Sequence, residues 1–173
     1  MHIIVDGYNL IRQSDVLRRC ERISLEEGRR ALVLNLARYR KMRGHRITVV
    51  FDGWEGGSPT EERDLAGGVE IIYSRLGEKA DEVIKRMLRA GSEEILVVTS
   101  DREIATFAAR RGKGTIASPE FASRLDRIAA GELPADADND EGAESERTGG
   151  KRKGPARRLS KQKRAALARI KKL

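Results

Sequence analysis

The chain has 173 residues, enough for one domain of ordinary size and an additional segment, and it can bury a hydrophobic core unaided. Its apolar fraction is 39%, and no apolar run approaches the ~20 residues that a membrane-spanning helix needs, so the composition excludes an integral membrane protein. The strand-like start leaves no room for a secretory signal, and a single cysteine, Cys20, cannot form an internal disulfide. These features predict a cytoplasmic protein.

Positive charge is concentrated at one end of the chain. Residues 1–131 carry 23 basic and 20 acidic groups, residues 132–150 carry one and seven, and residues 151–173 carry eleven and none. We expect a folded domain, an acidic flexible linker and a basic tail that can become helical when bound. A tail of this density attracts a polyanion such as nucleic acid through counterion release, and the alternative is a solvated tail that only keeps the protein soluble.

Short β-branched runs alternate with longer helical patterns along the first domain, which is typical of a parallel sheet covered by helices. The runs are nearly continuous, and this indicates burial on both faces of the sheet. Strands are predicted at Ile3–Val5, Arg46–Phe51, Val69–Tyr73, Glu94–Thr99 and near Thr115 and Ile116.

Helices are predicted from capping signals and from apolar spacing. A long helix begins after Ser24, whose capping box includes Glu27, and ends at Gly44 in a left-handed cap. Shorter helices are expected at Ala80–Ala90, Arg102–Arg111 and Ser118–Ala130, the last with Ser118 as its cap. The stretch Gly53–Gly68, rich in glycine, serine and glutamate, is predicted to be a long loop.

Four aspartates stand at corresponding points of these elements. Asp6, Asp52 and Asp101 come at or just after the ends of predicted strands, and Asp81 begins the helix after the third strand. Because the carboxyl ends of parallel strands meet at one edge of the sheet, we expect the four side chains to lie close together. Carboxylates gathered in this way repel one another unless a cation offsets their charge, and oxygen ligands favour Mg²⁺ or Mn²⁺. For each aspartate taken singly, the alternative is a helix N-cap.

Such a set of carboxylates suits metal-dependent hydrolysis of a phosphodiester bond. One ion activates a water molecule and a second, typically ~3.5–4 Å away, stabilises the leaving oxygen. This chemistry needs neither a protein nucleophile nor a 2′-hydroxyl, so the expected products carry a 5′-phosphate and a 3′-hydroxyl.

The neighbours of these aspartates refine the prediction. Gly7 is expected where the backbone passes close to a ligand. Asn9 is expected to hydrogen-bond Asp6 or a phosphate, or else to cap the short helix that follows. Ser100 is expected to orient a water molecule or contact phosphate, with a structural turn as the alternative.

Four segments together resemble a known family. DGYNLI at 6–11, VVFDG at 49–53, GEKADEVIKRM at 77–87 and VVTSDREI at 97–104 are similar to the YacP-like branch of the NYN-domain nucleases, within the PIN-like superfamily of metal-dependent ribonucleases. The resemblance covers about residues 1–130. It implies a PIN-like three-layer α/β/α sandwich with a central, mostly parallel sheet, for which the apolar runs predict five strands. It also implies carboxylates that bind Mg²⁺ or Mn²⁺ and endonucleolytic cleavage of RNA, in some relatives on the ribosome.

Matched residue by residue, the resemblance makes Asp6, Asp81 and Asp101 metal ligands, Asp52 a further ligand, and Asn9 the accompanying amide. Glu78 and Glu82 are alternatives to Asp81 if the helix begins at a different residue. Lys79 stands where relatives more often have a small polar residue, and it is expected either to contact phosphate or to disturb the metal.

We therefore expect a metal-dependent endoribonuclease whose partner is RNA, with the ribosome as a candidate platform. Candidate substrate-binding residues are Tyr8, Lys79, Ser100 and Arg102, and Tyr8 and Trp54 are candidate stacking platforms, with simple packing as the alternative.

Two other functions compete with this one. The first is a non-catalytic RNA- or ribosome-binding protein that uses the basic tail as its main contact. The second is a phosphatase acting on a small metabolite, disfavoured because no second aspartate stands two residues after Asp6. The pattern predicts no oligomeric state.

Overall fold

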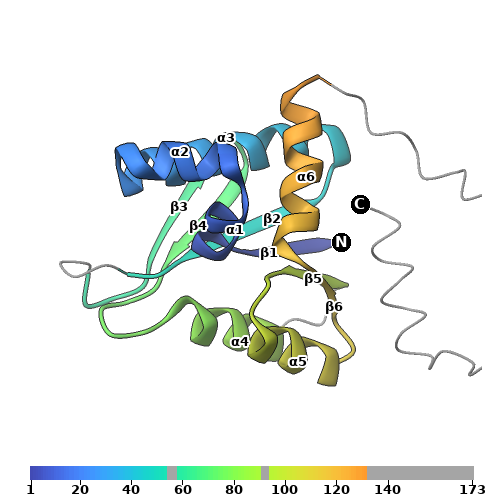
Figure 1. Ribbon diagram of the computed structural model, residues 1–173. Coiled ribbons are helices and arrows are strands. Elements are labelled where there is room, and N and C mark those ends of the chain that lie inside the picture. The colour runs from blue at the N-terminus through green and yellow to red at the C-terminus, as the bar shows by residue number, and fades with distance from the viewer. Residues whose placement is uncertain (54–57, 91–93, 132–173) are drawn as a thin grey trace, which may run out of the picture.

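A single sheet forms the centre of the protein. The computed structural model describes residues 1–53, 58–90 and 94–131, and within them six strands pair in the order β3-β4-β2-β1-β5-β6 (Figure 1). All pairs are parallel except the antiparallel pair of β3 and β4. The strands are β1 His2–Asp6, β2 Arg46–Phe51, β3 Glu62–Ala66, β4 Val69–Tyr73, β5 Ile95–Val98 and β6 Gly114–Ile116.

Helices cover both faces of this sheet. They are α1 Gly7–Gln13, α2 Asp15–Ile23, α3 Leu25–Arg43, α4 Ala80–Ala90, α5 Arg102–Arg110 and α6 Ser118–Ala129. Figure 1 shows α1, α2, α3 and α6 on one side of the sheet and α4 and α5 on the other. The three-layer α/β/α sandwich expected from the sequence is therefore confirmed.

The alternation of side chains along the strands explains the two layers of helices. Ile3 and Val5 of β1 pack into the core beneath α1, α3 and α6, whereas Ile4 between them packs against α4 and α5. All three side chains are fully buried. A strand with both faces covered is apolar at successive positions, and this is why β1, β2 and β5 appear as nearly continuous hydrophobic runs in the sequence.

The sheet has six strands and not the five predicted, because β3 lies within the stretch predicted to be a loop. Its side chains are mostly exposed and polar, so no apolar period marks it. The strand exists because Gly67 and Gly68, at φ +58° and +78°, form a tight turn that folds it back on β4. Turns with two positive φ angles favour the right-handed twist of a hairpin, and a Gly-Gly pair is a signal for them.

The capping predictions are partly confirmed. The Ser24 hydroxyl accepts from the Glu27 amide at 3.0 Å, and Gly44 ends α3 at φ +69°. The prediction that Ser118 caps α6 is wrong, because Ser118 is already helical and its hydroxyl bonds to a distant side chain described below. Helix α2 was not predicted, although Ser14 caps it by accepting from the Leu17 amide.

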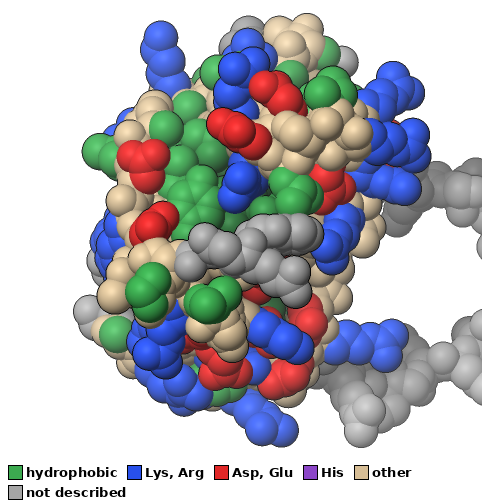
Figure 2. Space-filling view, turned by 90° about the vertical axis from the view of Figure 1, so that its left-hand side faces the viewer, with side chains coloured by type: hydrophobic (Ala, Val, Ile, Leu, Met, Phe, Trp, Pro, Cys, Tyr) green, Lys and Arg blue, Asp and Glu red, His purple; other side chains and the backbone are tan. Residues whose placement is uncertain are grey.

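The surface of the domain carries mixed charge. Figure 2 shows acidic and basic side chains interspersed around a hydrophobic patch on one face, in agreement with the near balance of charge over residues 1–131. No helix in the described part of the chain has the length and apolar character to cross a membrane. The predicted linker, residues 132–150, and the predicted tail, residues 151–173, lie outside the described residues.

The sheet order decides where a site can form. Strand β1 lies between β2 and β5, and the chain moves outward from it in one direction through β2 and β4 and in the other through β5 and β6. The order reverses at β1, so the connections that leave the carboxyl ends of β1 and β5 diverge to opposite faces. Ligands of open α/β sheets bind at such a point.

Candidate active site

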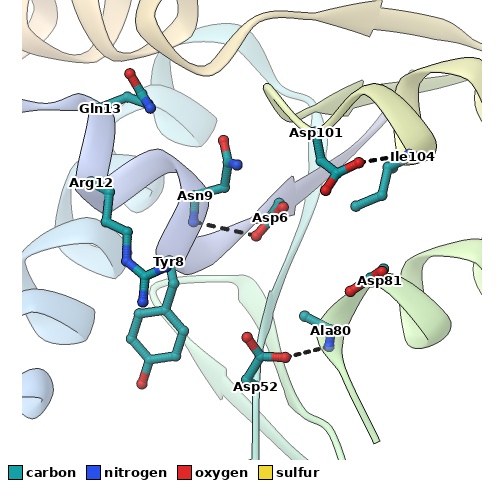
Figure 3. Close-up of a pocket in the computed structure, with 10 residues that line it drawn as sticks. All are labelled: Asp6, Tyr8, Asn9, Arg12, Gln13, Asp52, Ala80, Asp81, Asp101 and Ile104. Atoms are coloured by element: carbon teal, nitrogen blue, oxygen red, sulfur yellow. Dashed lines mark hydrogen bonds between the residues drawn. The ribbon is translucent and has the colours of Figure 1, made fainter.

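The four aspartates singled out in the sequence line one pocket at this edge of the sheet. The pocket has a volume of about 170 Å³, and Figure 3 shows the carboxylates arranged around it from β1, the end of β2, α4 and the start of α5. The prediction that they converge is therefore confirmed. The complete lining is Asp6, Tyr8, Asn9, Arg12, Gln13, Asp52, Ala80, Asp81, Asp101 and Ile104.

The carboxyl group of Asp6 has a raised pKa. Burial raises its pKa to about 6, and the negative charges of Asp52 and Asp81 act in the same direction. Hydrogen bonds from the Asn9 backbone N–H at 3.3 Å and from the Thr99 hydroxyl at 3.1 Å lower the pKa of Asp6 but do not cancel the effect of burial. A buried acid next to other acids is held at an energetic cost, which a bound cation would offset.

Asp52 and Asp101 each use one oxygen to cap a helix. The Asp52 Oδ1 atom accepts from the Ala80 amide at 2.5 Å, and the Asp101 Oδ1 atom accepts from the Glu103 and Ile104 amides at 2.6 and 3.2 Å. The second oxygen of each has no hydrogen bond to any described residue. A carboxylate has about four acceptor positions, so capping and ligand binding are compatible in the same residue.

Asp81 stands in the first turn of α4, and its carboxylate lies 3.7 Å from the Lys85 ammonium. The two neighbouring glutamates are held in ion pairs outside the pocket. Glu78 pairs with Arg86, and Glu82 pairs with Lys85 at 3.1 Å. Neither glutamate lines the pocket, so Asp81 is the acidic residue that this segment contributes.

The donor chemistry of the pocket fits a hard divalent cation. Each acidic group in it offers carboxylate oxygens, and the buried carboxylate of Asp6 faces like charges. With the side chains as they lie, no three acidic, histidine or cysteine residues within the described ranges are close enough to chelate one ion. Mg²⁺ usually keeps several waters and binds through one or two carboxylates, so a cluster of three direct ligands is not required.

Asn9 acts differently from the prediction. Its backbone N–H reaches Asp6, whereas its side-chain oxygen accepts from the Ser100 amide at 3.0 Å and from the Ser118 hydroxyl at 2.7 Å. The side chain therefore ties α1 to the loop after β5 and to the start of α6. Thr99, whose role was not predicted, provides the side-chain hydrogen bond to Asp6.

The proposed substrate-binding residues are divided between two places. Tyr8 lines the pocket, but its ring is buried edge-on against Phe51, with the ring centroids 5.2 Å apart. Gly7 is explained by the same ring, because a Cβ atom there would overlap Phe51. Lys79 is exposed in a separate depression with Arg75 and Leu76.

Two further predicted contacts do not lie in the pocket, and one cannot be placed. Arg102 is exposed and is not among the lining residues. Ser100 is also outside the lining, and its hydroxyl accepts from the Ser118 amide at 3.2 Å, which supports the structural-turn alternative. Trp54 lies outside the described residues.

Sequence reasoning missed two polar residues that line the pocket, Arg12 and Gln13. Both are exposed and belong to the last turn of α1, where Arg12 stands three positions after Asn9 and four after Tyr8. Residues at this spacing share one face of a helix. Once α1 is known to begin at Gly7, the spacing alone places Arg12 on the pocket side.

An α/β sandwich with acidic residues at the switch point of its sheet has its polar pocket where open α/β sheets bind ligands. The sequence profile of the YacP-like NYN domain matches residues 3–172, and the chain belongs to this family. NYN domains are PIN-like nucleases, a class that generally uses divalent metals. The match extends beyond residue 130, into the region predicted to be linker and tail.

Relatives from Bacillus subtilis agree with this assignment. The chain is 35% identical over 104 residues to the uncharacterized protein YacP of strain 168, an alignment that covers 57% of this chain and 59% of that protein. A crystal structure of Rae1 (YacP) matches with a TM-score of 0.62 and 30% identity over 75% of this chain and 76% of the other. The crystal structure of a mutant of Rae1 matches with a TM-score of 0.63 and 28% identity, over 75% and 77%.

Proposed function

We propose that this chain is a metal-dependent endoribonuclease that hydrolyses phosphodiester bonds in RNA. The observation that carries the proposal is the convergence of carboxylates from four separate segments on one pocket, in a chain of the NYN family. Asp6, Asp81 and Asp101 are the proposed metal ligands, with Asp52 as a further one. The proposed cofactor is Mg²⁺ or Mn²⁺, and RNA, including ribosome-associated RNA, is the proposed substrate.

Each residue has a defined part in this proposal. A bound divalent cation supplies positive charge that acidifies water and stabilises the negative charge of the phosphate. Asp6, at the carboxyl end of β1, provides a partly buried carboxylate, while Asp52 and Asp101 offer the oxygen that capping leaves free. Asn9 and Thr99 hold the loop and Asp6 in place. We expect products with a 5′-phosphate and a 3′-hydroxyl.

One observation favours a second candidate, a non-catalytic RNA-binding protein. Asp6, Asp52 and Asp101 all accept amide hydrogen bonds at helix starts, so each has a structural reason to be acidic. The nuclease needs the negative charge of these aspartates to bind a metal, whereas the RNA-binding protein needs only their capping hydrogen bonds. Asparagine caps a helix about as well as aspartate but is a poor metal ligand.

The substitution Asp101→Asn separates the two candidates. For the nuclease we expect Mn²⁺-dependent cleavage of single-stranded RNA to fall at least ~100-fold, while the affinity for RNA stays within about twofold. The matched control is Asp15→Asn, at an exposed position of α2 outside the pocket. A wild-type protein that binds RNA but cleaves none with either metal would support the binding module instead.

A further inference from the structure

The pocket has two chemically different walls. Figure 3 shows Asp52, Asp81 and Asp101 on one side and the side chains of α1 on the other, with Asp6 between them. The wall formed by α1 presents Asn9, Arg12 and Gln13, which offer amide and guanidinium groups. No other lysine or arginine lines this pocket in the described part of the chain.

Arg12 forms no ion pair with the described residues. Its side chain is exposed, and none of its nitrogens lies within 4.0 Å of a carboxylate oxygen of the described residues, although four aspartates line the same pocket. Its guanidinium lies 6.0 Å from the centre of the Tyr8 ring, at the outer limit of a cation–π contact. The Tyr8 ring is itself packed edge-on against Phe51.

We propose that Arg12, with Gln13 beside it, forms a phosphate subsite for the phosphodiester next to the one that is cleaved. The inference rests on the proposed function and names its substrate class: an oligonucleotide with at least two phosphates. Guanidinium groups match phosphate geometry and bind it with two parallel hydrogen bonds. A second phosphate held on the α1 wall places the scissile phosphate opposite it, over the carboxylates. The positive charge of Arg12 offsets the repulsion between these carboxylates and the polyanion.

The test compares two substrates that differ in the number of phosphates. Bis(p-nitrophenyl) phosphate has one phosphodiester and reports on the carboxylate wall, whereas a single-stranded RNA pentanucleotide also reaches the subsite. With Mn²⁺ we expect Arg12→Gln to reduce kcat/KM for the pentanucleotide at least tenfold more than for bis(p-nitrophenyl) phosphate, mainly through KM. Arg18→Gln on α2, which lies outside the pocket, is the matched control and leaves both values unchanged. Equal losses on the two substrates with Arg12→Gln would overturn the subsite.

A binding measurement keeps the inference separate from the proposed function. If the wild type cleaves neither substrate, the proposed function fails, and the subsite is then judged by fluorescence anisotropy of a labelled RNA pentanucleotide. We expect Arg12→Gln to weaken binding about tenfold and to reduce the slope of log Kd against log salt by about 0.7, the value for one contact to single-stranded phosphate. Unchanged affinity and slope would contradict the subsite.

Discussion

Asp6 links the site to the stability of the fold at the level of a single residue. Burial raises its pKa from 3.8 to about 6, so between these pH values the folded state holds a proton that the unfolded state has lost. Stability from this group is therefore present at low pH and declines as pH rises from about 4 to about 6. The shift corresponds to roughly 3 kcal/mol of unfolding free energy.

The substitution Asp6→Asn removes this dependence while keeping a side chain that can cap α1. In EDTA, we expect the variant to gain roughly 2–3 kcal/mol relative to the wild type between pH 4 and pH 7.5, measured by urea unfolding. Adding Mn²⁺ at pH 7.5 is the control, because it should stabilise the wild type more than the variant. A stability difference that is the same at both pH values would argue against a perturbed Asp6.

The positions of the aspartates were predictable from sequence, because strand ends are marked by hydrophobic runs. The hydrogen bonds around them were not. Asn9 meets Ser100 and Ser118, partners 91 and 109 positions away, and no local pattern encodes such pairs. Asn9 was correctly placed beside Asp6, but only its backbone makes the bond.

At the level of elements, Lys85 joins the two helices that carry Asp81 and Asp101. Its side chain is 7% exposed, and its ammonium donates to Glu103 of α5 at 2.6 Å and to Glu82 of α4 at 3.1 Å. The hydrogen bond to Glu103 is the main reason that the pKa of Lys85 lies above its ordinary value. This contribution to stability is present throughout the physiological range, since it is lost only when pH rises through the raised pKa.

We expect Lys85→Met to lower the unfolding free energy by about 1–2 kcal/mol, because methionine keeps most of the apolar packing but leaves the carboxylates without their partner. The loss is modest since Glu82 and Glu103 are exposed and can be hydrated. Urea unfolding measures it, with Lys79→Met, at an exposed lysine, as the control. If both variants are equally stable, Lys85 does not join the helices.

The elements themselves show what a local pattern can predict. β2, β4 and α4 have the predicted bounds, because apolar periodicity and neighbouring turns define them. β3 was missed because an exposed edge strand has no buried face, so its sequence shows no alternation of apolar and polar residues. Its strand conformation depends on hydrogen bonding to β4. The signal that was available is the Gly67-Gly68 turn.

In the molecule as a whole, we expect the domain and residues 151–173 to contribute separately to RNA binding, because their charges differ. The domain is nearly balanced, whereas these residues carry eleven basic and no acidic groups. We expect their deletion to weaken RNA binding and to flatten its salt dependence, since fewer counterions are released. Hydrolysis of bis(p-nitrophenyl) phosphate should be retained, and a chain with residues 151–173 replaced by a neutral Gly-Ser segment controls for length. Unchanged RNA affinity after deletion would exclude this role.

Anomalous diffraction from a crystal soaked in Mn²⁺ would show whether the pocket of Asp6, Asp52, Asp81 and Asp101 binds a hard divalent cation. We expect at least one anomalous peak in the pocket, within coordination distance of Asp6 or of a water that it holds, and of at least one other of these carboxylates. The number of peaks gives the number of ions. A well-diffracting crystal in excess Mn²⁺ with no peak in the pocket would mean that these carboxylates do not form a metal site.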